Sequence, residues 1–441
     1  MSGLRFLTDR ALLPQMRSKP NAPGVGKIRA LQKFRGVIYS AYGKIRSNPS
    51  LKVDNALCVV CAFFFVVVAT ADASAKCVAT PVYQGATLRG ALPTIEYPSG
   101  EIDRSRPVSG ALAAALDAQL TNLVESQTSA TSAAAAIWTD ADGFWTRTVG
   151  ESSDKPAHAF WWASVGKLAT ASIILQLVRD GELSLSDPIV GWFDGYPNAD
   201  LITIDHLLTH TGGVFSFNSD KKLNRKRGPK SSALLIETSR RHGADFCPGT
   251  NWNYSNTGYV MLSRIAESIT GESFADLVRM RLAKPLSLST LRVVEQDDPP
   301  SALVAAAGDE APGIAGIASI YGAGAIGSDA PDMIGFLSAY LSGRVTSPSL
   351  RNKAFSTLYP MFGPALYYGR GVMAMDVPDP ARPTIWLGHA GGAPNARGLV
   401  VYDIERGAFA SLVLNSDGPA EAIVNALFRT LDEQDEPRRA E

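Results

Sequence analysis

From about residue 106 onward, apolar residues recur at helix and strand spacings that predict the elements of the fold. Ser109 is placed to cap a helix whose apolar face would consist of Leu112, Leu116, Leu120 and Leu123. The runs 133–139 and 144–150 are strand-like, and the turn-forming residues 140–143 between them complete a predicted β-hairpin.

Helical patterns fill the middle of the chain. We expect helices over 163–180, 204–209, 257–270 and 330–341, the first and third of them ended by glycine. Ser273 is placed to cap a further helix. Residues 221–230 hold six basic side chains and a proline, which predicts a solvated loop.

Strand character returns near the end, over 384–387, 398–402 and 408–414, before a last helix over 420–431 and a charged tail, 431–441, that we expect to be frayed. Strands, then helices, then strands predict an α+β fold over 106–430. One antiparallel sheet would be built from the N- and C-terminal segments and flanked by helices. A mostly helical subdomain, about 185–320, would be inserted, with a ligand cleft beside it.

Composition is that of a globular protein, but the charges are unevenly spread. The 441 residues include 42 Lys and Arg, 42 Asp and Glu, and 46% hydrophobic residues, enough for a large core. Residues 1–75 hold 11 basic and three acidic side chains, which leaves the remainder with a net charge of −8. An acidic body repels phosphates, so we expect no nucleic-acid partner.

The N-terminal region has the pattern of a targeting segment. Residues 56–71 are all apolar or small, with basic residues before them and Ala73-Ser74-Ala75 after them. Residues 1–75 are interpreted either as a signal peptide cleaved before Lys76 or as an uncleaved membrane anchor. The body of the protein begins with a lead-in segment over 76–105. Both interpretations place this body outside the cytoplasm, as a periplasmic or secreted protein that is tethered to the membrane if residues 56–71 are retained.

Cysteine and histidine spacings give little support for a metal site. Cys77 and Cys247 are the only cysteines of the body, and their spacing leaves open whether they form a disulfide. His206 and His210, four apart on a predicted helix, fit a structural pair better than a zinc pair, because Leu207 stands where a metalloprotease needs glutamate. We expect no metal and no cofactor.

Ser-x-x-Lys occurs three times, and only Ser164 and Lys167 lie in an apolar, helical context. Lys167 would stand one turn beyond Ser164 on the same face of the helix. Apolar surroundings lower the pKa of a lysine, so a neutral amine there could accept the proton of the serine hydroxyl. The alternative is a serine helix cap followed by a surface lysine.

Two more stretches carry candidate chemistry, although each alone also fits a structural role. In Tyr254-Ser255-Asn256 the phenol could relay a proton to a leaving group, and the Asn256 amide could hold a substrate carbonyl or the lysine. Residues 388–392 read Gly-His-Ala-Gly-Gly where a strand is expected, and these glycines allow a substrate backbone to approach. The Gly392 and Ser164 amides could form an oxyanion hole, and His389 could orient a substrate carboxylate.

Together these residues resemble the serine β-lactamase-like, penicillin-binding superfamily, in its branch of class C β-lactamases, D-alanyl-D-alanine carboxypeptidases, D-aminopeptidases and serine esterases. The motifs of that family, Ser-x-x-Lys, Ser/Tyr-x-Asn and Lys/His-x-Gly, appear in order at 164–167, 254–256 and 389–391. Residues 207–213 are similar to its Leu-Leu-Thr-His-Thr-Ser-Gly loop, with Gly212 replacing serine. The resemblance covers about 106–430.

The resemblance implies a serine hydrolase without cofactor, acting on a small molecule or peptide with a scissile amide, β-lactam or ester carbonyl. It assigns the acyl-enzyme to Ser164, the proton transfers to Lys167 and Tyr254, and substrate contacts to Asn256, His389, Gly391 and Gly392. A catalytically weak family member that serves as a binding or scaffold protein is the competing interpretation.

Two departures from the family pattern bear on the substrate. His389 and Ala390 replace the first two residues of the Lys-Thr-Gly form of true β-lactamases, which puts strong β-lactam turnover in doubt. Arg397 would either contact a substrate carboxylate or lie on a strand surface.

Overall fold

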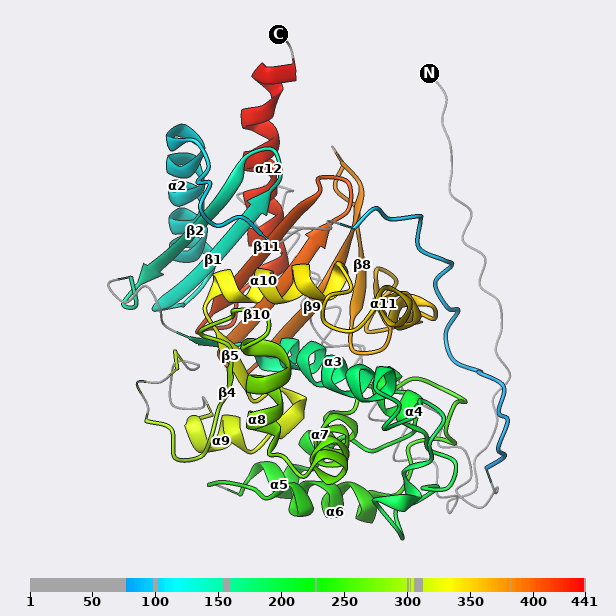
Figure 1. Cartoon of the computed structure of the whole chain (residues 1–441). Coiled ribbons are helices and arrows are strands. Elements are labelled where there is room, and N and C mark those ends of the chain that lie inside the picture. The colour runs from blue at the N-terminus through cyan, green and yellow to red at the C-terminus, as the bar shows by residue number, and fades with distance from the viewer. Residues whose placement is uncertain are drawn as a thin grey trace, which may run out of the picture. The chain divides into compact units, whose positions relative to one another are not determined.

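The computed structural model describes residues 77–97, 102–153, 159–226, 228–299, 301, 303–304, 312–380 and 382–439 (Figure 1). The apolar run and the basic stretch that predict a signal peptide or anchor lie outside these residues. Across the described part of the chain, no helix combines the length and apolar character needed to cross a membrane. The predicted domain boundaries stay a prediction.

An eight-stranded antiparallel sheet organises the described residues. Its strand order is β2-β1-β11-β10-β9-β8-β7-β6, so the first hairpin is joined edge to edge with strands from the end of the chain. The strands are β1 (Ser132–Thr139), β2 (Gly143–Gly150), β6 (Tyr359–Pro360), β7 (Leu366–Tyr368), β8 (Met373–Val377), β9 (Thr384–Ala393), β10 (Ala396–Asp403) and β11 (Ala408–Leu414). This arrangement confirms the predicted α+β fold.

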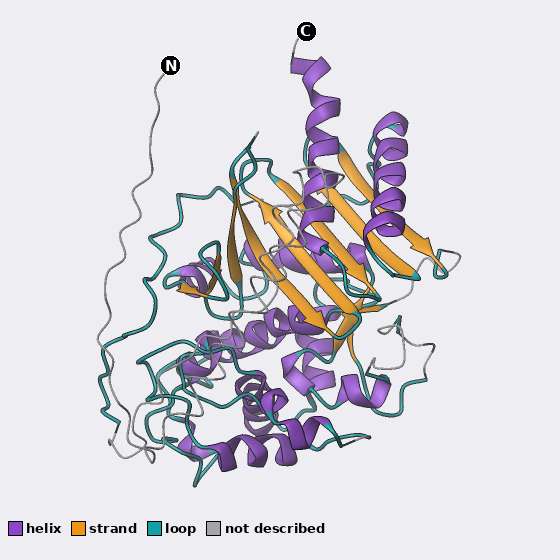
Figure 2. Cartoon of the chain, turned by 180° about the vertical axis from the view of Figure 1, so that it is seen from behind, coloured by secondary structure: helices purple, strands orange, loops and turns teal. Residues whose placement is uncertain are grey.

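Helices cover both faces of this sheet (Figure 1 and Figure 2). Within β1, Ala135 faces one hydrophobic core and Ala136 faces another, as alternation along a strand requires. Every residue of β1 is therefore buried. The covering helices are α2 (Gly110–Gln127) and α12 (Ala420–Arg439) on one face and α10 (Ala330–Leu341) on the other, with α11 (Pro348–Phe355) following α10 in the chain.

Between about residues 185 and 320 the described regular elements are helical, apart from one two-residue strand. That strand, β4 (Arg292–Val293), belongs to a second small sheet of order β3-β5-β4, with β3 (Phe160–Trp161) and β5 (Ile326–Ser328). The α-helices of this region are α4 (Ile204–Thr209), α5 (Lys221–Asn224), α6 (Ser232–His242), α7 (Asn256–Thr270), α8 (Phe274–Val278) and α9 (Ile314–Ala318).

Helix α3 (Gly166–Arg179) lies between the helical region and the large sheet (Figure 1). Its residues 166–177 are all buried, because neighbours pack around its whole circumference. An internal helix of this kind excludes water from any polar side chain that it carries.

Two expectations need correction, and three short strands were not predicted. The segment 221–230 is not a loop throughout, since α5 begins at Lys221, where the Asp220 side chain accepts a hydrogen bond from Leu223 N. Helix α12 continues to Arg439, beyond the predicted helix end at residue 431. No sequence pattern predicts β6, β7 and β8, which have two, three and five residues and are too short for a clear alternation.

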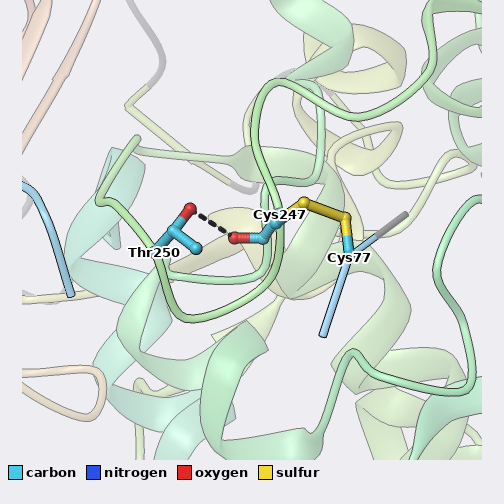
Figure 3. Close-up of a disulfide and its surroundings, with 3 residues drawn as sticks. All are labelled: Cys77, Cys247 and Thr250. Atoms are coloured by element: carbon cyan, nitrogen blue, oxygen red, sulfur yellow. Dashed lines mark hydrogen bonds between the residues drawn. A yellow bond between two sulfur atoms is a disulfide. The ribbon is translucent and has the colours of Figure 1, made fainter. Parts of the chain in front are cut away.

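A disulfide settles the question that the cysteine spacing leaves open. Cys77 and Cys247 are bonded across a separation of 170 residues (Figure 3). The Thr250 hydroxyl donates to Cys247 O at 2.7 Å, and Gln84 N donates to Thr250 O at 2.7 Å. The irregular lead-in segment is therefore fastened, by a covalent bond and a hydrogen bond, to the loop that precedes Tyr254.

We predict that Cys247→Ser lowers the free energy of unfolding by about 2–5 kcal/mol, because the open chain regains the conformational entropy of a long loop. Urea unfolding of the wild type and the variant, with and without reductant, measures the difference. Reductant should lower the midpoint of the wild type and leave that of Cys247→Ser unchanged. Equal midpoints for the oxidised wild type and the variant would contradict the prediction.

Candidate active site

Ser164 lies where β3 leads into α3. The chain passes through a 3₁₀ turn, Ala163–Val165, before the α-helix begins. Ala163 has a φ of 49°, in the left-handed region that disfavours residues with a side chain. Trp161 supports this bend by donating its indole N–H to Gly324 O at 2.7 Å. The bend leaves Ser164 partly exposed between buried neighbours.

Lys167 projects from the first turn of α3 into a dry environment. Its side chain has no exposed surface, and its Nζ lies 3.2 Å from Ser164 Oγ and 2.5 Å from Ala323 O. Desolvation by burial holds the pKa of Lys167 well below its usual value of 10.5. The neutral amine can donate to Ala323 O while it accepts the proton of Ser164.

Tyr254 completes a group of three polar side chains. Lys167 Nζ lies 4.9 Å from the centre of the Tyr254 ring. Burial raises the pKa of Tyr254, and a hydrogen bond with Ser164 partly opposes that rise. The structure therefore brings together the hydroxyl, the amine and the phenol that the three-motif pattern selects, although Tyr254 is separated from the other two by almost ninety positions.

Strand β9 approaches the backbone of Ser164 at Gly391. A Cβ at Gly391 would lie 2.8 Å from Ser164 N and 2.6 Å from Trp162 O, so a residue with a side chain does not fit. Gly392, the next residue, is exposed. The glycines of this strand thus let its backbone run against the turn that carries Ser164.

His389 is enclosed and does not face the solvent, contrary to the expectation that it orients a substrate carboxylate. Its Nδ1 lies 2.7 Å from Ala390 O, and its Nε2 lies 3.1 Å from the Tyr368 hydroxyl. A backbone carbonyl only accepts, so Nδ1 carries a proton, and Nε2 lies within hydrogen-bonding distance of the Tyr368 hydroxyl. Burial, reinforced by nearby Lys167, lowers the pKa of His389 to about 3. The ring is therefore neutral, with both nitrogens occupied by protein groups.

The Beta-lactamase family matches residues 113–433, which is more than half of the chain. The chain belongs to this family.

Two curated proteins of known name are similar to parts of this chain. Penicillin-binding protein 4 of Amycolatopsis lactamdurans is 37% identical over 134 residues, 29% of this chain and 34% of the relative. Teichoic acid D-alanine hydrolase of Staphylococcus aureus is 22% identical over 30% of this chain and 32% of the relative. The chain thus matches about a third of the length of these curated relatives.

A solved structure extends the likeness to most of the chain. The D-stereospecific amidohydrolase from Streptomyces sp. superposes with a TM-score of 0.63 and 26% identity, covering 72% of this chain and 98% of that protein. Two of these similar proteins are thus named as hydrolases, one of them for D-alanine.

His210 lies against the segment that carries Tyr254, and the sequence pattern indicates it only as a structural partner of His206 and as part of the family-like loop 207–213. It terminates α4 with a φ of 61°, so it leaves the helix and does not share a face with His206 as expected. Its Nδ1 accepts from Ser255 N at 3.1 Å, and its ring centre lies 4.3 Å from that of Tyr254. His210 therefore supports the segment that carries Tyr254. Within the described ranges, no three His, Cys, Asp or Glu residues are grouped to hold a metal.

Asn256, a predicted substrate contact, and Arg397, for which two roles are open, both have partners within the protein. The Asn256 side chain donates to Asn218 Oδ1 at 3.1 Å, and the hydrogen bonds of Lys167 go to other groups. Arg397 forms an ion pair with Asp417 at 2.7 Å, which favours the strand-surface alternative over a free substrate-binding arginine. Tyr368, which holds His389, was missed because nothing in the local sequence separates it from an ordinary strand tyrosine.

We predict that acid destabilises the protein through its buried histidines. Burial lowers the pKa of both His389 and His210, so below the unfolded value of 6.5 the unfolded chain binds protons that the native chain does not. Their contribution to stability is therefore complete above pH 6.5. For His389 it falls by about 1.4 kcal/mol per pH unit as the pH drops toward the lowered pKa of about 3, and His210 contributes in the same direction.

Urea unfolding at several pH values between 7 and 4 measures this slope. His389→Gln should reduce the slope, because the variant lacks one of the two groups whose pKa burial lowers. Wild type and His389→Gln with the same slope would show that His389 is protonated in the native state.

Proposed function

We propose that Ser164 is the nucleophile of a serine hydrolase that cleaves an amide or ester bond through an acyl-enzyme. The observation that carries this proposal is the 3.2 Å approach of Lys167 Nζ, fully buried and with a lowered pKa, to Ser164 Oγ. A surface lysine after a helix cap would be exposed and protonated, and it would have no capacity to accept a proton.

Acylation follows from the three converging side chains. Ser164 Oγ attacks the substrate carbonyl carbon, and its proton passes to Lys167 Nζ directly or through the Tyr254 oxygen. As the C–N or C–O bond breaks, Tyr254 delivers a proton to the departing atom and regains one from the Lys167 ammonium. Water then attacks the acyl carbon, its proton is taken by the same pair, and the proton returns to Ser164 Oγ as the acid leaves.

The backbone amides of Ser164 and Gly392 are proposed to stabilise the oxyanion. Support comes from the close approach of Gly391 to Ser164 N, which brings the two chain segments side by side. Donors of this kind act on the charge that develops in the transition state, and removing one typically costs about 10²–10³ in kcat.

The proposed substrates are D-amino acyl amides or esters. The Streptomyces relative is named as a D-stereospecific amidohydrolase, and the Staphylococcus relative as a teichoic acid D-alanine hydrolase. A neutral, enclosed His389 supplies no positive charge where the Lys-Thr-Gly form of true β-lactamases has a lysine, which disfavours β-lactams as the main substrates.

We predict that Ser164→Ala abolishes covalent labelling by a fluorophosphonate probe, and that Lys167→Ala slows labelling at least about 100-fold because the general base is lost. In-gel fluorescence and intact mass measure the modification. Ser219→Ala is the matched control, since it removes an exposed serine from another Ser-x-x-Lys sequence, and it should be labelled like the wild type. Labelled Ser164→Ala, or a wild type that is not labelled and turns over no D-amino acyl amide or ester, would reject the proposed function in favour of a binding or scaffold protein.

We also propose that the enzyme acts outside the cytoplasm. The Cys77–Cys247 disulfide supports this location, since such bonds persist in oxidising compartments. When the full chain is produced in a bacterium, we expect folded protein in the periplasm or medium with a first residue near Lys76, as N-terminal sequencing would show. Full-length protein in the membrane fraction would favour the anchor, and full-length protein confined to the cytoplasm would contradict export.

A further inference from the structure

Phe362 is an aromatic side chain in solvent beside the proposed active site. Its exposed fraction is 67%, and among the described residues it is the only aromatic one of the large hydrophobic side chains that are exposed. It lies in the turn between β6 and β7, where the preceding Met361 is 3% exposed and points into the core. The turn thus buries one apolar side chain and presents the next one outward.

The backbone conformation that presents Phe362 is unfavourable. Phe362 has a φ of 54°, in the left-handed region, although the residue after it is glycine and would adopt that conformation at little cost. A non-glycine residue held there costs about 1–3 kcal/mol, and such strain concentrates at ligand-binding and catalytic sites. Exposure and strain together indicate a role for this ring other than packing.

The ring of Phe362 is adjacent to the proposed proton relay. Its centre lies 6.0 Å from that of Tyr254 and 5.9 Å from that of Trp252, and the Trp252 and Tyr254 rings are 6.4 Å apart. We call these three rings the aromatic wall. Lys167 Nζ lies 4.9 Å from the centre of the Tyr254 ring and 3.2 Å from Ser164 Oγ, which places one end of the wall beside the nucleophile, so a group against the wall is within reach of the reaction.

The wall is uncharged and of the right spacing to receive another ring. Aromatic pairs favour centre-to-centre distances of about 4.5–7 Å, and each such pair adds to the free energy gained from burying apolar area. An anionic side chain would lose its hydration there without a counter-charge among the three rings. The best occupant is thus an aromatic or large aliphatic side chain.

We infer that the aromatic wall is a specificity subsite that holds an apolar side chain of the substrate, and that Phe362 selects large D-amino acyl groups over small ones. This inference rests on the proposed function, which supplies the D-amino acyl amide or ester as the class of substrate. It adds a prediction of which substrates are used best, because small acyl groups such as D-alanyl leave the exposed ring uncovered.

The test compares kcat/KM for D-phenylalanine p-nitroanilide and D-alanine p-nitroanilide. The wild type should favour the phenylalanyl substrate by at least about 10-fold, the lower end of what an apolar pocket supplies. Phe362→Ala should lower this preference about 10-fold, and Phe362→Leu should lower it less. Met280→Ala, which removes another exposed apolar side chain from the chain, should leave the preference unchanged.

A binding measurement separates this inference from the proposed function. Titration calorimetry of Ser164→Ala with D-phenylalanine amide and D-alanine amide should show tighter binding of the former, and adding Phe362→Ala should remove the difference. Turnover of both anilides with a ratio insensitive to Phe362 would overturn the inference and leave the proposed function intact. Selective, Phe362-dependent binding without any turnover would support the subsite and reject the hydrolase. Equal binding of the two amides would overturn the subsite.

Discussion

Removal of water from Lys167 is the constraint on which the rest of the site depends. An ammonium group in this position loses its hydration, so burial holds the pKa of Lys167 well below its usual value. A lowered pKa is what an ordinary lysine needs to act as a base at neutral pH. The fold achieves it by placing α3 between the large sheet and the helical region, where every residue from 166 to 177 is buried.

The surrounding groups protect this electrostatic state. His389 and His210 are both neutral in the native protein, so neither adds a positive charge that would compete with proton transfer to Lys167. Nε2 of His389 lies beside the Tyr368 hydroxyl, and Nδ1 of His210 accepts from the backbone of Ser255. The two histidines therefore contribute hydrogen bonds to the polar cluster without adding charge.

The sequence was most informative where chemistry and local spacing coincide. Ser164 and Lys167 are one helical turn apart, so their approach follows from helix geometry alone. The sheet built from both the N- and C-terminal segments could also be predicted, because its long strands and flanking helices have clear periodicities. The orientation of His389 could not, since which face of β9 is enclosed depends on Tyr368, contributed by a strand too short to recognise. The Asn256 and Arg397 contacts likewise depend on Asn218 and Asp417, which distant segments place.

The pairing of β1 with β11 has a consequence for biosynthesis. Ala133 of β1 lies opposite Leu414 of β11. Strand β1 is synthesised early, but it can pair on that edge only after β11, one of the last segments, has left the ribosome. The turn bearing Ser164 packs on Gly391, which also emerges late. The packing around Ser164 is therefore complete only after nearly all of the chain has been synthesised and the sheet has closed.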